Sequence, residues 1–449
     1  MKPTMRQGGR AGIAVVRLAA AAAAAILLFG PLTLLFGDSP RRQKPETFRL
    51  GAGEDVLYQK DSSSAMTVVE LFIAGGKSAV PAGKDGLAYL VTRLTLEIPD
   101  FSAAQDVMAQ ATRMSVSVLE DCSVVSLECL SENLEDTLRV GSGIIQAPLF
   151  SGLRIDNVKK GMSLYAKADE DDAVATGHDA AMAAFFGRRG YGGADYGTEA
   201  SLKAIDKKDV ASFYGRLFTR NGVFFSVCSN LDKETVRPLL EKYFTRFPAA
   251  PAAQLTPTPS SLPGVREVRL EKDTKQSYVA MTFLFPPAAP ADYARGYLVE
   301  VLLGVGPGSR LWNLRAAERL AYNVGARTTW TKGNGVLEAY LETENPKKDK
   351  AVTALEAVLK SLYDGGVTED ELSMTKSLAR AQLLRSSEAK KFRARNVGFW
   401  RVLGLAFDDL DGVFARLDAV TVDEINAFIR ELLDPAKSVL IIVGGKDGR

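Results

Sequence analysis

Two stretches of this chain match each other, and they decide the fold. The first reads AIDKKDVASFYGRLFTRNGVFFSVCSN (residues 204–230) and the second reads AVTVDEINAFIRELLDPAKSVLIIVGG (residues 419–445). Each has apolar residues at helical spacing, followed by a short turn and an apolar run typical of a strand. Phe213 and Phe428 occupy equivalent places in the two stretches. A match of this kind indicates an internal duplication.

The segments that open the two halves of the chain also match. An apolar strand run, TVVELFI (residues 67–73) or YVAMTFLF (residues 278–285), is followed in each half by a helical pattern and then by β-rich sequence. This mixed order of strands and helices, present twice, predicts an α+β fold. We expect two homologous domains, each a mostly antiparallel sheet with helices packed on one face.

A stretch rich in proline, alanine and serine separates the two halves. FPAAPAAQLTPTPSSLPG, residues 247–264, can neither pair as a strand nor continue as a helix, so it is typical of an exposed linker. We therefore expect an N-terminal domain over residues 45–247, a linker over residues 248–264 and a C-terminal domain over residues 265–449. Residues 1–44 are expected to form a basic segment and a membrane anchor.

The N-terminal segment has the pattern of a transmembrane helix. Basic residues precede an apolar run from Leu18 to Phe36, which would span roughly 28 Å as a helix, about the thickness of a bilayer core. The exit sequence LLFGDSPRRQK has no convincing cleavage site, although a cleaved signal peptide is the alternative. The basic residues place the N-terminus in the cytoplasm and the body on the other side of the membrane.

Composition excludes several classes of function. The net charge is +2, and no basic patch with interleaved aromatic residues occurs, so we expect no nucleic-acid partner. His178 is the single histidine of the chain, which excludes chemistry that needs two imidazoles. Its helical pattern, ATGHDAAMAAFF, predicts a surface or boundary side chain. The cysteines, Cys122, Cys129 and Cys228, are expected to be buried free thiols.

One helical segment carries a resemblance to a known family. PAGKDGLAYLVTRLTLE (residues 81–97) resembles the signature segment of the pitrilysin/insulinase-type metallopeptidases, the family of mitochondrial processing peptidase. There the helix carries His-x-x-Glu-His, in which two histidines bind zinc and the glutamate activates the metal-bound water. In this chain the motif positions hold Tyr89, Thr92 and Arg93. The resemblance extends over about residues 45 to 449.

The resemblance implies that the zinc site is lost. The family's third zinc ligand, a glutamate on a later helix, would fall near Tyr165 in GMSLYAKADEDD. Arg93 would place a fixed positive charge where the zinc ion sits in the family, which opposes metal binding. We therefore expect no catalytic residue, no metal and no cofactor in this chain.

A second segment keeps a different part of the family pattern. GVGPGSRLWNLRAAERLAYNVGA (residues 304–326) resembles a segment in which active members carry an arginine and a tyrosine seven residues apart, reaching across to hydrogen-bond the bound peptide. Arg315 and Tyr322 stand at that spacing. A guanidinium and a phenol are donors suited to a peptide carbonyl. The alternative is that both residues only cap and pack a helix end.

The resemblance implies an arrangement and a function. The two domains would face each other across a cleft, and some family members divide the zinc motif and the arginine–tyrosine pair between two chains. This chain would then be the non-catalytic subunit of a heterodimer, binding and positioning peptide substrate for a zinc-bearing partner chain. The expected location is a bacterial-type inner membrane, with the body facing the periplasm. The alternative is a scaffold or peptide-binding protein without an enzymatic partner.

Overall fold

The computed structural model of this chain describes residues 44–98, 104–105, 107–108, 110–262, 264 and 266–445. The expected membrane anchor, from Leu18 to Phe36, lies outside the described residues. Within the described ranges, no helix is long and apolar enough to cross a membrane. Residues Gln43–Arg449 form one compact unit.

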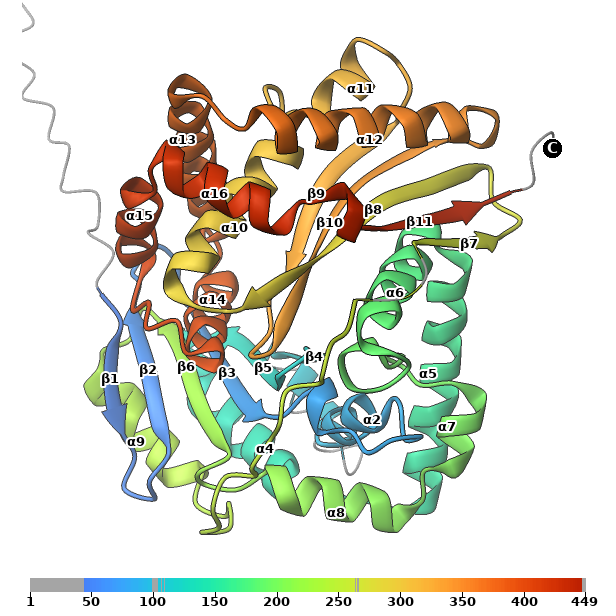
Figure 1. Cartoon of the computed structure of the whole chain (residues 1–449). Coiled ribbons are helices and arrows are strands. Elements are labelled where there is room, and N and C mark those ends of the chain that lie inside the picture. The colour runs from blue at the N-terminus through green and yellow to red at the C-terminus, as the bar shows by residue number, and fades with distance from the viewer. Residues whose placement is uncertain are drawn as a thin grey trace, which may run out of the picture. The chain divides into compact units, whose positions relative to one another are not determined.

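The first half of this unit is built on a six-stranded sheet with the order β1-β2-β6-β3-β5-β4 (Figure 1). Of the neighbouring strands, only β2 and β6 run parallel. The strands are β1 (Glu46–Arg49), β2 (Asp55–Lys60), β3 (Met66–Ala74), β4 (Arg113–Val118), β5 (Cys122–Leu130) and β6 (Val223–Ser229). The helices described in this half are α2 (Leu87–Leu94), α4 (Leu134–Gln146), α5 (Gly152–Asp171), α6 (Ala173–Phe186), α7 (Glu199–Ala204), α8 (Lys207–Leu217) and α9 (Lys233–Tyr243).

The second half repeats this arrangement in a five-stranded sheet, β7-β11-β8-β10-β9, in which only β7 and β11 run parallel. The strands are β7 (Glu267–Glu271), β8 (Gln276–Pro287), β9 (Asn323–Thr329), β10 (Asn334–Glu344) and β11 (Val439–Gly444). The helices are α10 (Pro290–Gly304), α11 (Trp312–Ala316), α12 (Lys348–Gly365), α13 (Glu369–Ser386), α14 (Lys390–Leu403), α15 (Leu410–Ala419) and α16 (Val422–Leu432). Position by position, this order matches β2-β6-β3-β5-β4. The predicted α+β class and duplication are confirmed.

Both sheets are covered on both faces, which explains their unbroken apolar strands. In β3, Val69, Leu71 and Ile73 join the core formed with the helices of the same half. The alternate residues Val68 and Phe72 point to the opposite face and are also buried. Since successive side chains of a strand point to opposite faces, a strand buried on both sides reads as a continuous apolar run.

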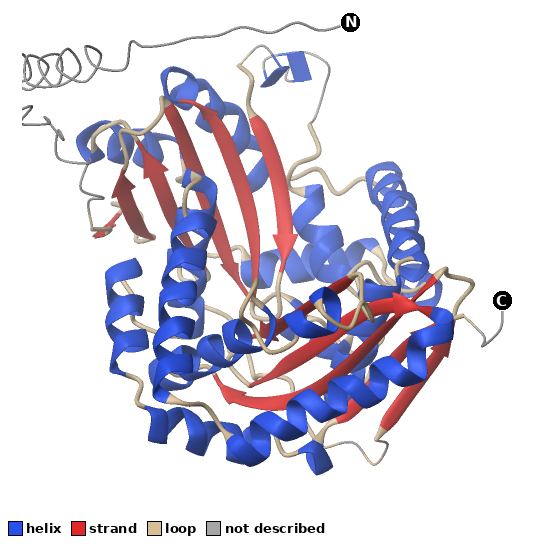
Figure 2. Ribbon diagram, turned by 90° about the horizontal axis from the view of Figure 1, so that it is seen from above, coloured by secondary structure: helices blue, strands red, loops and turns tan. Residues whose placement is uncertain are grey.

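The second face of each sheet is covered by a helix from the other half. α14, from the second half, lies on β3 and β6 of the first sheet, and α6, from the first half, lies on β8 and β11 of the second sheet. Figure 2 shows the two groups of strands, each flanked by helices. The sequence predicts helices on one face of each sheet. This prediction holds for the helices that belong to the same half as the sheet. The exchange of α6 and α14 was not predicted.

Glycine lets both exchanged helices approach their sheets closely. A Cβ atom at Gly398 of α14 would lie 2.1 Å from the ring of Phe72 on β3. A Cβ atom at Gly177 of α6 would lie 2.4 Å from the ring of Tyr278 on β8. In each contact the helix backbone packs directly on an aromatic ring, which a larger residue would prevent. The two halves therefore dock their exchanged helices in the same way.

A buried ion pair fixes α14 on the first sheet. Glu70 of β3 is fully buried, and its Oε2 accepts a hydrogen bond of 2.5 Å from Nε of Arg395. The other oxygen, Oε1, has no hydrogen-bond partner among the described residues. A second pair joins Lys391 of α14 to Glu128 of β5 at 2.6 Å. Arg395 is therefore the charge that compensates the carboxylate buried under α14.

Replacing Arg395 by alanine should destabilise the protein by roughly 3–5 kcal/mol, because it leaves the buried Glu70 carboxylate uncompensated. The additional change Glu70→Gln should restore most of this loss. Urea unfolding monitored by circular dichroism measures both effects. As a control, Arg401→Ala breaks a more exposed pair with Asp55 and should cost less than about 1 kcal/mol. Equal losses for Arg395→Ala and Arg401→Ala would contradict this assignment.

The segment between the halves has no helix or strand over residues 248–262. It is nevertheless attached to the first half. The side chain of Thr258 is buried, and its Oγ1 accepts a hydrogen bond of 3.1 Å from the backbone N–H of Tyr191. The backbone N–H of Ser261 donates to the carbonyl of Phe185 at 2.9 Å. The linker is therefore partly packed, and not exposed along its whole length.

The three cysteines are buried and free, as predicted.

Glu300 of α10 should make stability depend on pH. Burial raises the pKa of this carboxyl to about 7, and the neighbouring Thr328 opposes the increase. Because the pKa in the folded protein lies above the usual value, ionisation of Glu300 lowers the free energy of unfolding. This loss of stability is absent below about pH 4.5, grows up to about pH 7 and is constant at higher pH. Glu300→Gln should therefore raise the free energy of unfolding by about 1–2 kcal/mol at pH 8 and leave it unchanged at pH 4. Urea unfolding at both pH values tests this, and an equal effect at both would contradict it.

Candidate functional site

Helix α2 positions the three residues that replace the zinc motif. Its buried face, including Leu90 and Val91, packs into the core of the first half. Thr92 is also buried, and its hydroxyl donates to the carbonyl of Ala88 at 2.7 Å. The guanidinium of Arg93 forms an ion pair of 2.8 Å with Glu97, one turn along the chain. The side chains of Thr92 and Arg93 thus both interact with groups of the same segment.

Tyr89 belongs to a cluster of three tyrosines, which we call the tyrosine cluster. Its ring centroid lies 4.8 Å from that of Tyr196 and 6.4 Å from that of Tyr165, both in edge-to-face geometry. Tyr165 and Tyr196 lie 5.2 Å apart. Tyr165 comes from α5 and is 51% exposed. The residue that the resemblance aligns with the third zinc ligand therefore lies beside the residue aligned with the first.

The tyrosine cluster and its neighbours do not fit a zinc ion. Burial raises the pKa of Tyr196 to about 12 and also raises that of Tyr89, so both phenols keep their protons at neutral pH. Arg93 is a cation and cannot donate an electron pair to a metal. In the part of the chain that the structure describes, no group of three histidine, cysteine, aspartate or glutamate side chains could hold a metal ion.

Restoring the ligand set should create a metal site only if Tyr165 occupies the third-ligand position. We expect no measurable zinc binding for the natural chain by isothermal titration calorimetry. The variant with Tyr89→His, Thr92→Glu, Arg93→His and Tyr165→Glu should bind zinc, because two imidazoles and a carboxylate then converge. The matched control without Tyr165→Glu should bind at least about tenfold more weakly. Equal affinity of the two variants would show that Tyr165 lies outside the ligand position.

A cavity of about 720 Å³ lies beside the tyrosine cluster and has Tyr196 in its wall. The other walls come from α5, α6, the loop before α7 and β7, so both halves of the chain contribute. Carboxylates predominate among its charged groups, including Asp169, Asp179 and Asp195, while Arg188 and Lys272 bring positive charge. A cavity of this size is large enough for side chains of a bound peptide.

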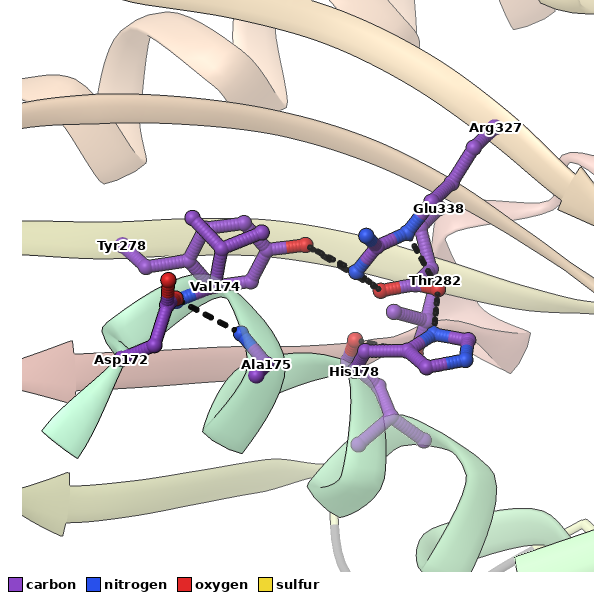
Figure 3. Close-up of polar contacts among 9 residues, drawn as sticks. Asp172, Val174, Ala175, His178, Tyr278, Thr282, Arg327 and Glu338 are labelled. Atoms are coloured by element: carbon purple, nitrogen blue, oxygen red, sulfur yellow. Dashed lines mark hydrogen bonds and ion pairs between the residues drawn. The ribbon is translucent and has the colours of Figure 1, made fainter. Parts of the chain in front are cut away.

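Beside this cavity, His178 joins the two halves through a buried carboxylate (Figure 3). Its Nδ1 lies 2.5 Å from Oε1 of Glu338 on β10, and Glu338 is fully buried. The same carboxylate accepts hydrogen bonds from Arg327 at 3.0 and 2.9 Å and from the hydroxyl of Tyr278 at 3.1 Å. Burial alone would raise the pKa of Glu338, but His178 and Arg327 lower it to about 2.

This contact had no role in the sequence-based interpretation of His178. The prediction was a surface or boundary side chain, and His178 is indeed 28% exposed. Its partnership with Glu338 was missed, since the two residues are 160 positions apart. The available signal was a charged residue inside the apolar run of β10, which required a partner from another element.

Arg315 and Tyr322 lie in a different part of the molecule from the tyrosine cluster. Arg315 is exposed on α11, with its guanidinium 5.1 Å from the ring centre of Trp312. Tyr322 is 53% exposed, and its hydroxyl donates to Glu344 at 2.8 Å. α11 contacts β9, whereas α2 contacts α5 and α8, and Figure 1 shows α11 and α2 well apart. The structure therefore does not bring the pair to the replaced zinc motif.

Comparisons with known proteins relate this chain to peptidases whose catalytic motif is missing. The sequence profile described as "Peptidase M16 inactive domain" matches residues 204–378. A protein of Helicobacter pylori named "Non-peptidase homolog YmxG" is 23% identical over 397 residues, which cover 87% of this chain and 92% of that protein. These matches identify an M16-like chain, and its motif positions lack the catalytic residues.

Solved structures share the fold of this chain. A structure titled as a peptidase M16 inactive domain from Pseudomonas fluorescens has a TM-score of 0.81 and 20% identity, covering 90% of this chain and 98% of that chain. A chain of "Complex III2 from Candida albicans" has a TM-score of 0.75 and 14% identity, covering 89% of this chain and 95% of that chain. These likenesses show the fold, while the profile match and the replaced zinc motif indicate a non-catalytic M16-like protein.

Proposed function

We propose that this chain is a non-catalytic, membrane-anchored subunit of a zinc metallopeptidase, which binds and positions peptide substrate for a zinc-bearing partner chain. The observation that carries the proposal is that the chain lacks the zinc motif of the family pattern but keeps its arginine–tyrosine pair. The motif positions Tyr89, Thr92 and Arg93 cannot support zinc chemistry, while Arg315 and Tyr322 keep the donors that hold a peptide in active relatives. A partner with its own His-x-x-Glu-His motif would complete the site.

The surroundings of Arg315 and Tyr322 suit a role in binding. Both side chains are exposed, and their partners are the face of Trp312 and the carboxylate of Glu344. Contacts of this kind at exposed sites contribute about 1 kcal/mol or less. A peptide carbonyl could therefore replace them at a small cost in free energy, and the guanidinium and the phenol would donate hydrogen bonds to it.

The membrane part of the proposal rests on the N-terminal sequence. Basic residues followed by the apolar run from Leu18 to Phe36 favour a single-pass anchor, with the body in the periplasm of a bacterial cell. The bacterial origin of the Helicobacter pylori relative is consistent with such a location. An anchor would keep the chain and its partner together at the membrane surface, which raises their effective concentration.

The first experiment is a pull-down of the full-length chain from membranes in mild detergent, with co-purifying proteins identified by mass spectrometry. We expect a stoichiometric partner that carries His-x-x-Glu-His. Isolation without such a partner would count against the proposal and would favour a scaffold role. The same preparation, separated into membrane and soluble fractions, reports whether the chain is anchored.

In the complex with that partner, Arg315→Ala and Tyr322→Phe should each lower kcat/KM for peptide cleavage by roughly 10- to 100-fold, because each removes a donor to the bound peptide. Both changes should leave the thermal unfolding midpoint nearly unchanged, since the side chains are exposed. Arg416→Ala, which removes another exposed arginine from α15, is the matched control. Unchanged activity of both variants would show that the pair only packs locally.

A second candidate function is a scaffold without peptidase activity in any partner. It is favoured by the fold similarity to a chain of Complex III2, although a shared fold does not establish a shared function. A complex whose members all lack the zinc motif, isolated in the same pull-down, would support this candidate. Arg315 and Tyr322 would then be ordinary surface residues.

A further inference from the structure

The two exchanged helices are docked by the same kind of contact, with one chemical difference. On the first sheet, the buried Glu70 binds Arg395 of α14, and a guanidinium stays charged at every physiological pH. On the second sheet, the buried Glu338 binds His178 of α6. Imidazole is the side chain whose charge ordinarily changes between about pH 5 and 8. Only the second contact therefore joins its helix to its sheet through a cation that can lose its charge.

Anions outnumber the other cations around His178. The anions that interact with it are Glu338, Glu120 and Asp179, and Arg327 is the cation that shares the Glu338 carboxylate. Lys77, Arg188 and Asp195 interact in turn with Asp179. The hydroxyl of Tyr278, which donates to Glu338, is a further titratable neighbour. A protonated imidazole therefore offsets part of this negative charge.

We propose that the contact between His178 and Glu338 is a pH-sensitive latch that holds α6 on the second sheet. Protonated His178 provides an ion pair and a hydrogen bond between the two halves. Loss of the imidazole proton at higher pH removes the ion pair, and α6 is then held less tightly. The proposal does not depend on the role suggested above as a peptidase subunit.

Two features allow this contact to weaken without unfolding the protein. Arg327 and Tyr278 keep the buried Glu338 carboxylate hydrogen-bonded whatever the charge of His178. The N-terminus of α6 is capped independently, because Asp172 accepts hydrogen bonds from the backbone N–H groups of Val174 and Ala175 at 2.7 and 3.0 Å (Figure 3). Helix α6 can therefore stay helical while its attachment to the sheet loosens.

The latch acts on the cavity beside the tyrosine cluster. Helix α6 supplies Thr176 and Asp179 to one wall of this cavity. Leu270 of β7 and Lys272, directly after β7, supply another wall from the second half. Loosening α6 from the second sheet separates two of the elements that enclose the cavity. Access to the cavity should therefore be greater above neutral pH than below it.

Hydrogen–deuterium exchange of the full-length chain at about pH 5.5 and about pH 8 tests the latch. After correction for intrinsic exchange, the protection of amides in α6 should fall roughly three- to tenfold at the higher pH, relative to amides in α14. Helix α14 is the internal control, since its contact uses Arg395. An unchanged ratio of α6 to α14 protection in the natural chain would overturn the proposal.

Two variants make the result specific to His178. His178→Arg supplies a permanent cation, as in the other contact, and should keep high protection of α6 at both pH values. His178→Gln keeps a neutral donor and should show, at both pH values, the lower protection that the natural chain has at about pH 8. Persistence of the pH dependence in His178→Gln would overturn the proposal. Protection of α14 reports whether each variant is folded. If His178→Arg is not folded, the comparison of the natural chain with His178→Gln decides whether His178 causes the pH dependence.

Discussion

The contact between each sheet and the helix supplied by the opposite half is the constraint on which the rest of the molecule depends. A sheet whose two faces are both apolar has to be covered on both sides, and each half covers only one side with its own helices. α6 and α14 cover the other sides. Neither half can therefore bury its sheet completely without the other, and residues Gln43–Arg449 form one compact unit.

Polar groups make these contacts specific. Apolar packing alone would accept many helix positions, but a buried carboxylate accepts only a position that brings it a cation. The pairs of Glu70 with Arg395 and of Glu338 with His178 define where α14 and α6 lie along their sheets. The two contacts have the same form, as expected after duplication, and they differ in the chemistry of the cation. That difference distinguishes a permanent attachment from one that responds to pH.

The replaced zinc motif shows what becomes of a catalytic site when its chemistry is lost. The helix that carries the motif is kept, since its buried residues belong to the core of the first half. The motif positions hold other residues, and Tyr89 packs against Tyr165 and Tyr196. A cavity lies beside them, with walls from both halves. A surface for binding can thus persist after the ligands of the metal are gone.

The sequence by itself determined the duplication, the α+β class and the absence of the zinc motif. Apolar periodicity reports directly which residues are buried, and the identity of a side chain at a motif position states whether it can bind a metal. The exchange of α6 and α14 was decided only by the tertiary structure. A strand buried on both faces has the same apolar run whichever helix covers it, so its sequence does not name its partner. For the same reason the tyrosine cluster and the pairing of His178 with Glu338 could not be read from spacing, since these residues meet only after distant segments have packed together.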